Sequence, residues 1–192
     1  LSMRRTDIAV IGAGPQALTL VTHLLQKKKK MRDRLSAGLC TGFQVFDPSG
    51  TWLANWHRQF AAQEIPHLRS PAVHHPDCNP HTLLSFAERR QDELHPPYNR
   101  PGTKLFQEFC ETVIDRWHLR DRVTKAQVVG LTPQKGRFCL TLADGQKESA
   151  RRVVLATGSA IAKMPSWTKQ LTQYHPRGFA MLKRFICQPC VR

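Results

Sequence analysis

Apolar residues mark a strand, a helix and a second strand in the first quarter of the chain. Four consecutive apolar residues, Ile8–Ile11, stop at a glycine, which is typical of a strand buried on both faces. Helical spacing follows through about Gln26, in the apolar residues Leu18, Leu20, Val21, Leu24 and Leu25. A second short run, Phe43–Asp47, ends in an acid. This order predicts an α/β fold with a mainly parallel sheet.

The next part of the chain has little periodicity. From Pro48 to Gly102 prolines are dense and histidines and tryptophans gather, which predicts a Pro/His-rich loop region with one short helix at about His81–Arg90. An amphipathic helix then begins near Thr103, with its apolar stripe at Leu105, Phe106, Phe109, Cys110, Val113, Ile114 and Trp117.

The last patterned segment predicts a small antiparallel β-meander. Val123–Leu131 and Arg137–Leu142 have the pattern of strands, and Asp144-Gly145 is a hairpin turn leading to a third strand. Val153–Ala156 follows as another doubly buried strand, closed by Thr157-Gly158. The predicted fold class is therefore α/β and Rossmann-like.

The turn between the first strand and the helix carries the candidate chemistry. Residues 12–17 read GAGPQA, the G-x-G-x-x-A form of the dinucleotide fingerprint. Gly12 allows the tight turn, Gly14 lets a pyrophosphate approach the backbone, and Ala17 keeps the helix close to the strand. Pro15 and Gln16 open the helix, where exposed amides and the positive end of the helix dipole would meet the phosphates.

An acid at the end of the second strand supports this interpretation. Asp47 is placed to accept both ribose hydroxyls of a dinucleotide. It lies 35 positions after Gly12 (47 − 12), against a usual spacing of about 20, and an inserted basic surface loop from Lys27 to Thr41 accounts for the excess. The alternative is a βαβ core that binds nothing.

Charge broadens the list of partners without selecting one. The chain has 29 basic and 14 acidic residues, a formal net charge of +15, which permits attraction to nucleic acid, anionic membranes or a polyanionic ligand. No DNA- or RNA-binding motif accompanies the charge, so we interpret it as a solvated helix end and a basic tail, and a nucleic-acid partner is not expected.

Cysteine usage and hydropathy bear on the compartment. Six cysteines at irregular spacings, in a chain too long to need disulfide staples, favour a reducing, cytoplasmic setting. The chain has no run of about 18 apolar residues, so no membrane span is expected. Asp7 and the break at Gly14-Pro15 argue against a secretory leader.

Two other constellations are weaker. His74, His75, Cys78 and His81 suggest a zinc site, but no second ligand pair at zinc spacing follows, so no metal is expected. Cys187 and Cys190 have thioredoxin-like spacing without a helix to lower a thiol pKa.

Taken in order, these motifs give the chain a family resemblance. The fingerprint, the acid-tipped second strand, the meander and Ala156-Thr157-Gly158 make it resemble the N-terminal half of a two-dinucleotide-binding flavoprotein. It is most similar to flavin-dependent lysine and ornithine N-monooxygenases and their uncharacterised relatives, and Gly50-Thr51-Trp52 resembles Baeyer–Villiger and flavin-containing monooxygenases. The resemblance covers roughly Thr6 to Trp167. It implies an incomplete FAD-binding domain at residues 6–167, followed by a basic tail at 168–192.

The resemblance also implies roles for residues. The cofactor would be FAD, with Gly12, Gly14 and Ala17 at the pyrophosphate and Asp47 at the adenosine ribose. Val128 or Val129 would lie near the adenine. The other residues implied to contact or approach FAD are Trp52, Trp56, Thr157 and Gly158. The segment Pro66–Arg69 would run beside the flavin ring, with His57 and Arg69 as catalytic candidates, and NADPH would be the co-substrate.

Two family features do not appear in the sequence. There is no second glycine fingerprint for NADPH after Thr157-Gly158, and no C-terminal Gly-Asp segment. The sequence therefore predicts a fragment or truncated form of an FAD-binding, monooxygenase-like oxidoreductase that lacks the NADPH-binding half. The alternative is a catalytically silent dinucleotide-binding module whose basic surface binds an acidic partner. The substrate and the oligomeric state are not readable.

Overall fold

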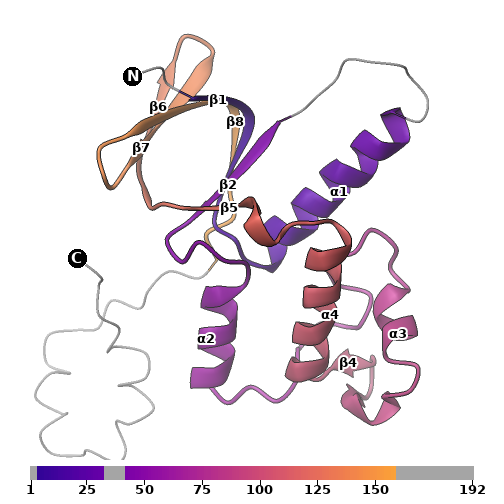
Figure 1. Cartoon of the computed structure of the whole chain (residues 1–192). Coiled ribbons are helices and arrows are strands. Elements are labelled where there is room, and N and C mark those ends of the chain that lie inside the picture. Colours follow the sequence, from indigo (N-terminus) through magenta and orange to yellow (C-terminus); the bar gives the residue numbers. More distant parts are fainter. Residues whose placement is uncertain (1–3, 33–41, 159–192) are drawn as a thin grey trace, which may run out of the picture.

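A computed structural model describes residues 4–32 and 42–158 (Figure 1). Its strands are β1 (Arg4–Ile11), β2 (Phe43–Asp47), β3 (Leu94–His95), β4 (Arg100–Pro101), β5 (Val123–Lys125), β6 (Val128–Gln134), β7 (Arg137–Leu142) and β8 (Lys147–Leu155). Its helices are α1 (Pro15–Arg32), α2 (Ala54–Ala62), α3 (Thr82–Phe86) and α4 (Thr103–Arg116), with the 3₁₀ turns η1 (Gln91–Glu93) and η2 (Arg120–Arg122).

One six-stranded sheet organises these elements, in the order β5-β2-β1-β8-β7-β6. The pairs β5–β2, β2–β1 and β1–β8 are parallel, whereas β8–β7 and β7–β6 are antiparallel. The predicted Rossmann-like α/β fold with a mainly parallel sheet and a small meander is thus confirmed. Figure 1 shows the sheet at one end of the molecule, with α2, α3 and α4 gathered at the other.

Alternation along β1 divides the interior into two cores. Ile8 and Val10 face the core that the helices complete, whereas Ala9 faces a second core made with Phe46 and the meander residue Leu140. Successive side chains of a strand point to opposite faces, so a strand apolar on both faces must be covered on both sides. Helices cover one face of β1, and the curled antiparallel strands cover the other.

The first helix is longer than its apolar pattern. The predicted end near Gln26 and the predicted loop from Lys27 are wrong, because α1 runs to Arg32 and includes the lysine run. Lysine and methionine are good helix formers, so the helix continues after its buried face has ended. Thr22, which is buried, fixes α1 to the following loops by donating its hydroxyl hydrogen bond to the Pro76 carbonyl at 2.5 Å.

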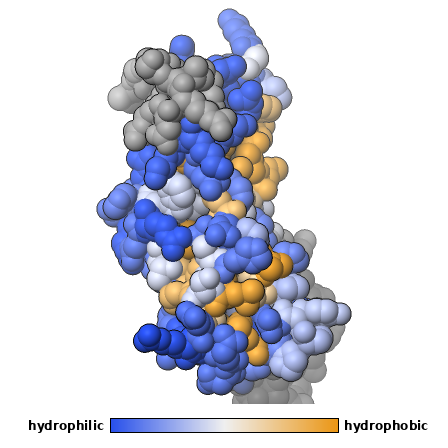
Figure 2. Space-filling view, turned by 90° about the vertical axis from the view of Figure 1, so that its right-hand side faces the viewer, coloured by the Kyte–Doolittle hydropathy of each residue, from blue (hydrophilic) through white to orange (hydrophobic). Residues whose placement is uncertain are grey.

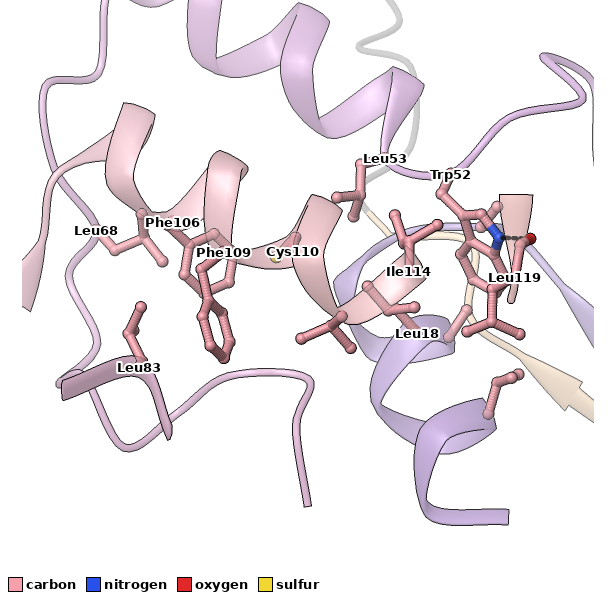
Figure 3. Close-up of a cluster of buried hydrophobic side chains, with 14 of the residues drawn as sticks. Leu18, Trp52, Leu53, Leu68, Leu83, Phe106, Phe109, Cys110, Ile114 and Leu119 are labelled. Atoms are coloured by element: carbon pink, nitrogen blue, oxygen red, sulfur yellow. Dashed lines mark hydrogen bonds between the residues drawn. The ribbon is translucent and has the colours of Figure 1, made fainter. Parts of the chain in front are cut away.

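The helix α4 begins at Thr103, as predicted, and buries the stripe Leu105, Phe106, Phe109, Cys110, Val113 and Ile114. Figure 3 shows this stripe packed with Leu18, Leu53, Leu68 and Leu83 from other segments. Burial raises the pKa of the Cys110 thiol strongly, so this cysteine is a packing residue rather than a nucleophile. The helix therefore anchors the Pro/His-rich region to α1.

Four other element predictions need correction. The segment Pro48–Gly102 holds α2 as well as loops, and the helix expected at His81–Arg90 is only the five residues of α3. The strand expected at Val123–Leu131 is two strands, β5 and β6, because the chain passes from one edge of the sheet to the other between them. The third meander strand and the buried strand at Val153–Ala156 form the single strand β8.

The outer surface is mostly hydrophilic on the face that Figure 2 shows, with hydrophobic residues confined to a narrower band. None of the helices within residues 4–32 and 42–158 has the length and apolar character that crossing a membrane requires.

Candidate functional site

A cavity of about 1540 Å³ lies where the carboxyl ends of β1, β2 and β8 meet. Such an edge of a parallel sheet is where open α/β folds bind ligands. The volume exceeds the roughly 300–1,000 Å³ of pockets for drug-sized molecules, so the cavity suits an extended ligand. Its lining comes from residues 11–16, 46–49, 54–56, 58–60, 63, 65–70, 73–78, 80, 127–128 and 156–158, with Thr19, His23 and Phe106.

Gly12 makes the turn out of β1 possible. Its φ is +103°, and a Cβ built there would lie 2.3 Å from the Ala156 carbonyl oxygen. The Gly12 amide donates to the Phe46 carbonyl at 2.8 Å, and the Ala156 amide donates to the Ile11 carbonyl at 2.8 Å. Any side chain at position 12 would push β1 and the end of β8 apart, so the fingerprint glycine is a structural necessity here.

Gly14 leaves open space beside the backbone of the turn. A Cβ built there would meet only the Gln16 side chain, at 3.9 Å, so the space beside this backbone is open. The Gly14 carbonyl accepts the first hydrogen bond of α1, from the Leu18 amide, at 3.0 Å. Pro15 and Gln16 line the cavity with it, and the first turn of α1 has no acidic residue. The free amides and the helix dipole therefore favour an anion at this point.

Asp47 lies at the tip of β2 and turns toward the glycine turn. Its Oδ2 accepts a hydrogen bond from the Ala13 amide at 3.1 Å, and its Oδ1 accepts the Ser49 amide at 2.9 Å and the Ser49 hydroxyl at 2.5 Å. A carboxylate has about four lone-pair sites, so acceptor capacity remains for a ligand. The acid and the open backbone of Gly14 thus border one continuous cavity.

Some of the residues predicted near the adenine and at the end of β8 line the cavity, and others lie on the surface. Val128 lines the cavity, whereas Val129 is 58% exposed and lies outside the lining. Thr157 and Gly158 line it at the end of β8. Leu155, predicted as doubly buried, is 68% exposed. Val128 and Val129 are consecutive residues of β6, and successive side chains of a strand point to opposite faces, which explains the first difference.

Two predicted cofactor residues belong to the core. Ala17 is fully buried and keeps α1 against the sheet, as its place in the fingerprint predicts. Trp52 is only 6% exposed and lies outside the cavity lining. Its indole Nε1 donates to the Leu119 carbonyl at 2.7 Å (Figure 3). The structure therefore makes Trp52 a link between the β2–α2 connection and the end of α4.

Trp56 and its neighbours form an aromatic wall of the cavity. The Trp56 ring stacks on Phe60 with centroids 4.1 Å apart and lies 5.5 Å from the Phe106 ring. All three residues line the cavity. Phe60 and Phe106 were not among the predicted site residues, and the i, i+4 spacing of Trp56 and Phe60 on a helix was the available signal.

The two catalytic candidates lie in different surroundings. Arg69 is exposed and lines the cavity. His57 is half-buried outside the lining, with its ring 5.3 Å from Trp56. Burial lowers the pKa of the His57 imidazole, against a smaller opposing effect from Glu111. Its Nε2 is buried and has no hydrogen-bond partner among the described residues.

Of the four residues that suggest a zinc site in the sequence, His75 supports its own loop. His75 is buried, its Nδ1 accepts the Asp77 amide at 3.1 Å, and its Nε2 lies 3.2 Å from the Pro80 carbonyl. Asp77 forms an ion pair with Arg116 of α4. The described part of the chain has no group of three or more histidine, cysteine or acidic side chains placed to hold a metal ion.

Comparisons with known proteins agree with this geometry. A family model described as FAD-NAD(P)-binding matches residues 9–160. No curated protein sequence matches the chain.

Solved structures share the fold at low identity. A flavin-containing monooxygenase from Stenotrophomonas maltophilia superposes with a TM-score of 0.53 and 20% identity, over 85% of this chain and 42% of its own. A mutant cyclohexanone monooxygenase from Rhodococcus sp. Phi1, bound to NADP+, gives 0.56 and 18%, over 84% and 28%. The bacillithiol disulfide reductase of Staphylococcus aureus gives 0.51 and 14%, over 86% and 43%. The chain thus spans less than half the length of each of these proteins.

Proposed function

This chain belongs to the FAD-NAD(P)-binding family, and on that premise we propose that it is the FAD-binding part of a monooxygenase-like oxidoreductase that uses NADPH. The observation that carries the proposal is the pairing of an open glycine turn with Asp47, whose Oδ2 lies 3.1 Å from the Ala13 amide of that turn. An anion-binding helix start and a sugar-binding carboxylate are thereby held side by side.

The chain's own residues fit FAD in a defined order along the cavity. Gly14, Pro15 and Gln16 would receive the pyrophosphate, and Asp47 the adenosine ribose. Val128 would border the adenine, in place of the exposed Val129. The open turn at Gly14 leaves room for the pyrophosphate, since only the Gln16 side chain comes within 4 Å of a Cβ built there.

At the other end of the cavity, Trp56 would present its stacked rings to the flavin and exclude water. Arg69 would place a cation beside the ring, which favours its anionic reduced form. Bound FAD would supply the redox chemistry, taking a hydride from NADPH and passing electrons to oxygen. Thr157 and Gly158 would border the cofactor at the end of β8.

We assign the protein a small-molecule substrate and a cytoplasmic setting. Irregularly spaced cysteines support the reducing compartment, and the absence of any DNA- or RNA-binding motif in the sequence supports a small molecule rather than nucleic acid.

The glycine turn provides a direct test. Gly14→Ala would place a methyl group where the pyrophosphate lies, and we expect FAD to bind at least about tenfold more weakly. Gly42→Ala is the matched control, because its Cβ also has free space, with Thr6 Oγ1 the nearest atom at 3.9 Å, at the opposite end of β2. Flavin absorbance after gel filtration and calorimetric titration with FAD measure the effect. Equal FAD affinity in the two variants would refute the proposed site.

A further inference from the structure

Three short extended segments pair at one rim of the cavity, and we call them the rim sheet: residues 66–69, β3 and β4. The Leu68 amide donates to the Pro101 carbonyl at 2.9 Å, and His67 is bridged to Gly102 in antiparallel register. On the other side of β4, Leu94 pairs with Pro101 and His95 pairs with Arg100. Both neighbours of β4 are therefore fixed by backbone contacts.

The register divides the rim sheet into two unlike faces. Leu68, Leu94 and Pro101 are all buried, and the two leucines belong to the main hydrophobic core. Because side chains alternate along a strand, the residues on either side of these three point away from that core. On this outward face the rim sheet presents basic side chains from His67, Arg69, His95 and Arg100, and Glu93, which precedes Leu94 and lies opposite Gly102, adds one acid.

Two basic side chains of this face, those of His67 and His95, lie close together. The His67 and His95 rings are 4.7 Å apart, across β4, where Gly102 contributes no side chain. Arg100 donates from Nη2 to the Pro96 carbonyl at 2.5 Å, and its buried Nε has no hydrogen-bond partner among the described residues. Buried donors are normally satisfied, so this guanidinium has an unused directional donor.

The carboxylate of Glu93 does not neutralise the basic side chains of this face. The Glu93 carboxylate is held by Arg90, with Oε1 at 2.5 Å from Nε and Oε2 at 2.9 Å from Nη2. His67 and Arg69 also line the cavity, whereas His95 and Arg100 lie behind them, outside its lining, so the basic face borders the space of the aromatic wall of Trp56 and Phe60 through its first segment. An anion held here would have the rest of its molecule in reach of that wall.

We propose that the outward face of the rim sheet binds the carboxylate of a small organic substrate, with Arg69 and Arg100 as the principal contacts. Guanidinium groups match a carboxylate in two-point hydrogen bonding, and such bonds are stronger than neutral ones. The inference deepens the proposed function by naming a substrate class, acidic molecules with an apolar or aromatic body. Its binding test works with or without FAD.

The experiment uses benzoate as the probe and benzamide as its uncharged analogue. Calorimetry on the purified chain, with and without added FAD, should show benzoate binding at least about tenfold more tightly. Arg69→Gln and Arg100→Gln should each reduce that preference by about tenfold. Arg69 is exposed, so its variant keeps the fold even if Arg100→Gln does not. Arg89→Gln, an exposed arginine before η1, is the matched control and should keep the preference.

Three results would overturn the proposal: equal binding of benzamide and benzoate, a benzoate preference that survives in Arg69→Gln, or, with FAD occupying the Gly14 turn, tighter binding of inorganic phosphate than of benzoate. The proposed function is tested separately in the same experiment. A chain that prefers benzoate but takes up no FAD would refute the flavoprotein assignment alone. A chain that binds FAD without any benzoate preference would refute the carboxylate site alone.

Discussion

At the scale of single residues, buried histidines couple the fold to pH. His75 is buried with both ring nitrogens in hydrogen-bond contact with the backbone of its loop. Its Nδ1 accepts a proton-donating amide, so protonation of that nitrogen would break the contact. Burial lowers the pKa of the His75 imidazole, with smaller opposing effects from the Pro80 carbonyl and Asp77. The folded state therefore holds this ring neutral.

This environment predicts acid lability. In the unfolded chain the His75 imidazole binds a proton below its pKa of about 6.5, whereas in the folded chain it resists protonation until the pH reaches its lowered pKa. The stability that this histidine contributes above pH 6.5 is therefore lost as the pH falls from that value through the lowered pKa of the folded state. In His75→Gln the dependence of unfolding free energy on pH should flatten, by at most about 1.4 kcal/mol per pH unit. His57, whose pKa burial also lowers, leaves a residual slope.

Urea unfolding of the wild type and variant at a series of pH values below 7 measures this effect. His81→Gln is the control, because His81 is exposed and its side chain should not change the slope. An unaltered slope in His75→Gln would contradict the lowered pKa of His75 in the folded chain.

At the scale of elements, the junction of β1 and β8 is the most tightly constrained part of the site. Gly12 has a positive φ and also touches the Ala156 carbonyl, whereas Gly136, in the β6–β7 turn, has a φ of +73° and no atom within 4 Å of a built Cβ. At Gly136 a side chain would meet only backbone strain, whereas at Gly12 it would meet backbone strain and also the neighbouring strand β8.

Substitution by alanine should separate the two costs. Gly136→Ala should lose about 1–2 kcal/mol of unfolding free energy from the left-handed conformation alone. Gly12→Ala carries a comparable backbone strain and must also displace β8, so we expect it to lose roughly 2 kcal/mol more than Gly136→Ala. Chemical denaturation of the FAD-free chain measures both. Losses of the same size in the two variants would contradict the close contact between β1 and β8.

Prediction from sequence succeeded where the pattern is local. The strand Arg137–Leu142 has the predicted bounds, and α4 begins at the predicted residue, since alternation and a helical apolar stripe are visible within a few turns. The glycine turn and Asp47 were also found, because tight turns restrict residue type strongly. The helix α2 was missed because it has no fully buried residue, and its two large apolar residues, Trp56 and Phe60, are too few to establish a helical period.

Features that depend on distant contacts could not be predicted in this way. That Trp52 serves the core depends on the Leu119 carbonyl, 67 positions away. The basic face of the rim sheet depends on the register of three segments, and single basic residues among prolines do not reveal it. The contact of Asp47 with the Ala13 amide joins residues 34 positions apart, and nothing in the sequence pattern indicates it.

At the scale of the whole molecule, the cavity joins segments from the start, middle and end of the described chain, so a ligand there should stabilise all of them together. FAD at about 100 times its dissociation constant contributes about 2.7 kcal/mol. For a domain of this size, that corresponds to a rise in Tm of roughly 5–10 °C.

Hydrogen exchange of the chain with and without FAD can locate this stabilisation. Amides of the β1–α1 turn, Ser49 and residues 156–158 should exchange more slowly with FAD, beyond the uniform effect of global stability. The turn at Lys135-Gly136, remote from the cavity lining, should gain no local protection. Gly14→Ala should show neither the protection nor the Tm rise. Protection confined to the rim sheet would contradict the proposed position of FAD.

The placement of β1 has a consequence for how the protein is made. Its residues Arg4–Ile11 pair on one side with β2 and on the other with Glu148–Leu155 of β8. A ribosome that has released β1 and β2 must still translate more than a hundred codons before the second partner emerges. Until then one edge of β1, whose residues Ile8, Ala9 and Val10 are buried in the finished fold, stays open to wrong partners. Because the Gly12 turn rests against Ala156, the nascent chain completes the packing of its glycine turn only when β8 arrives.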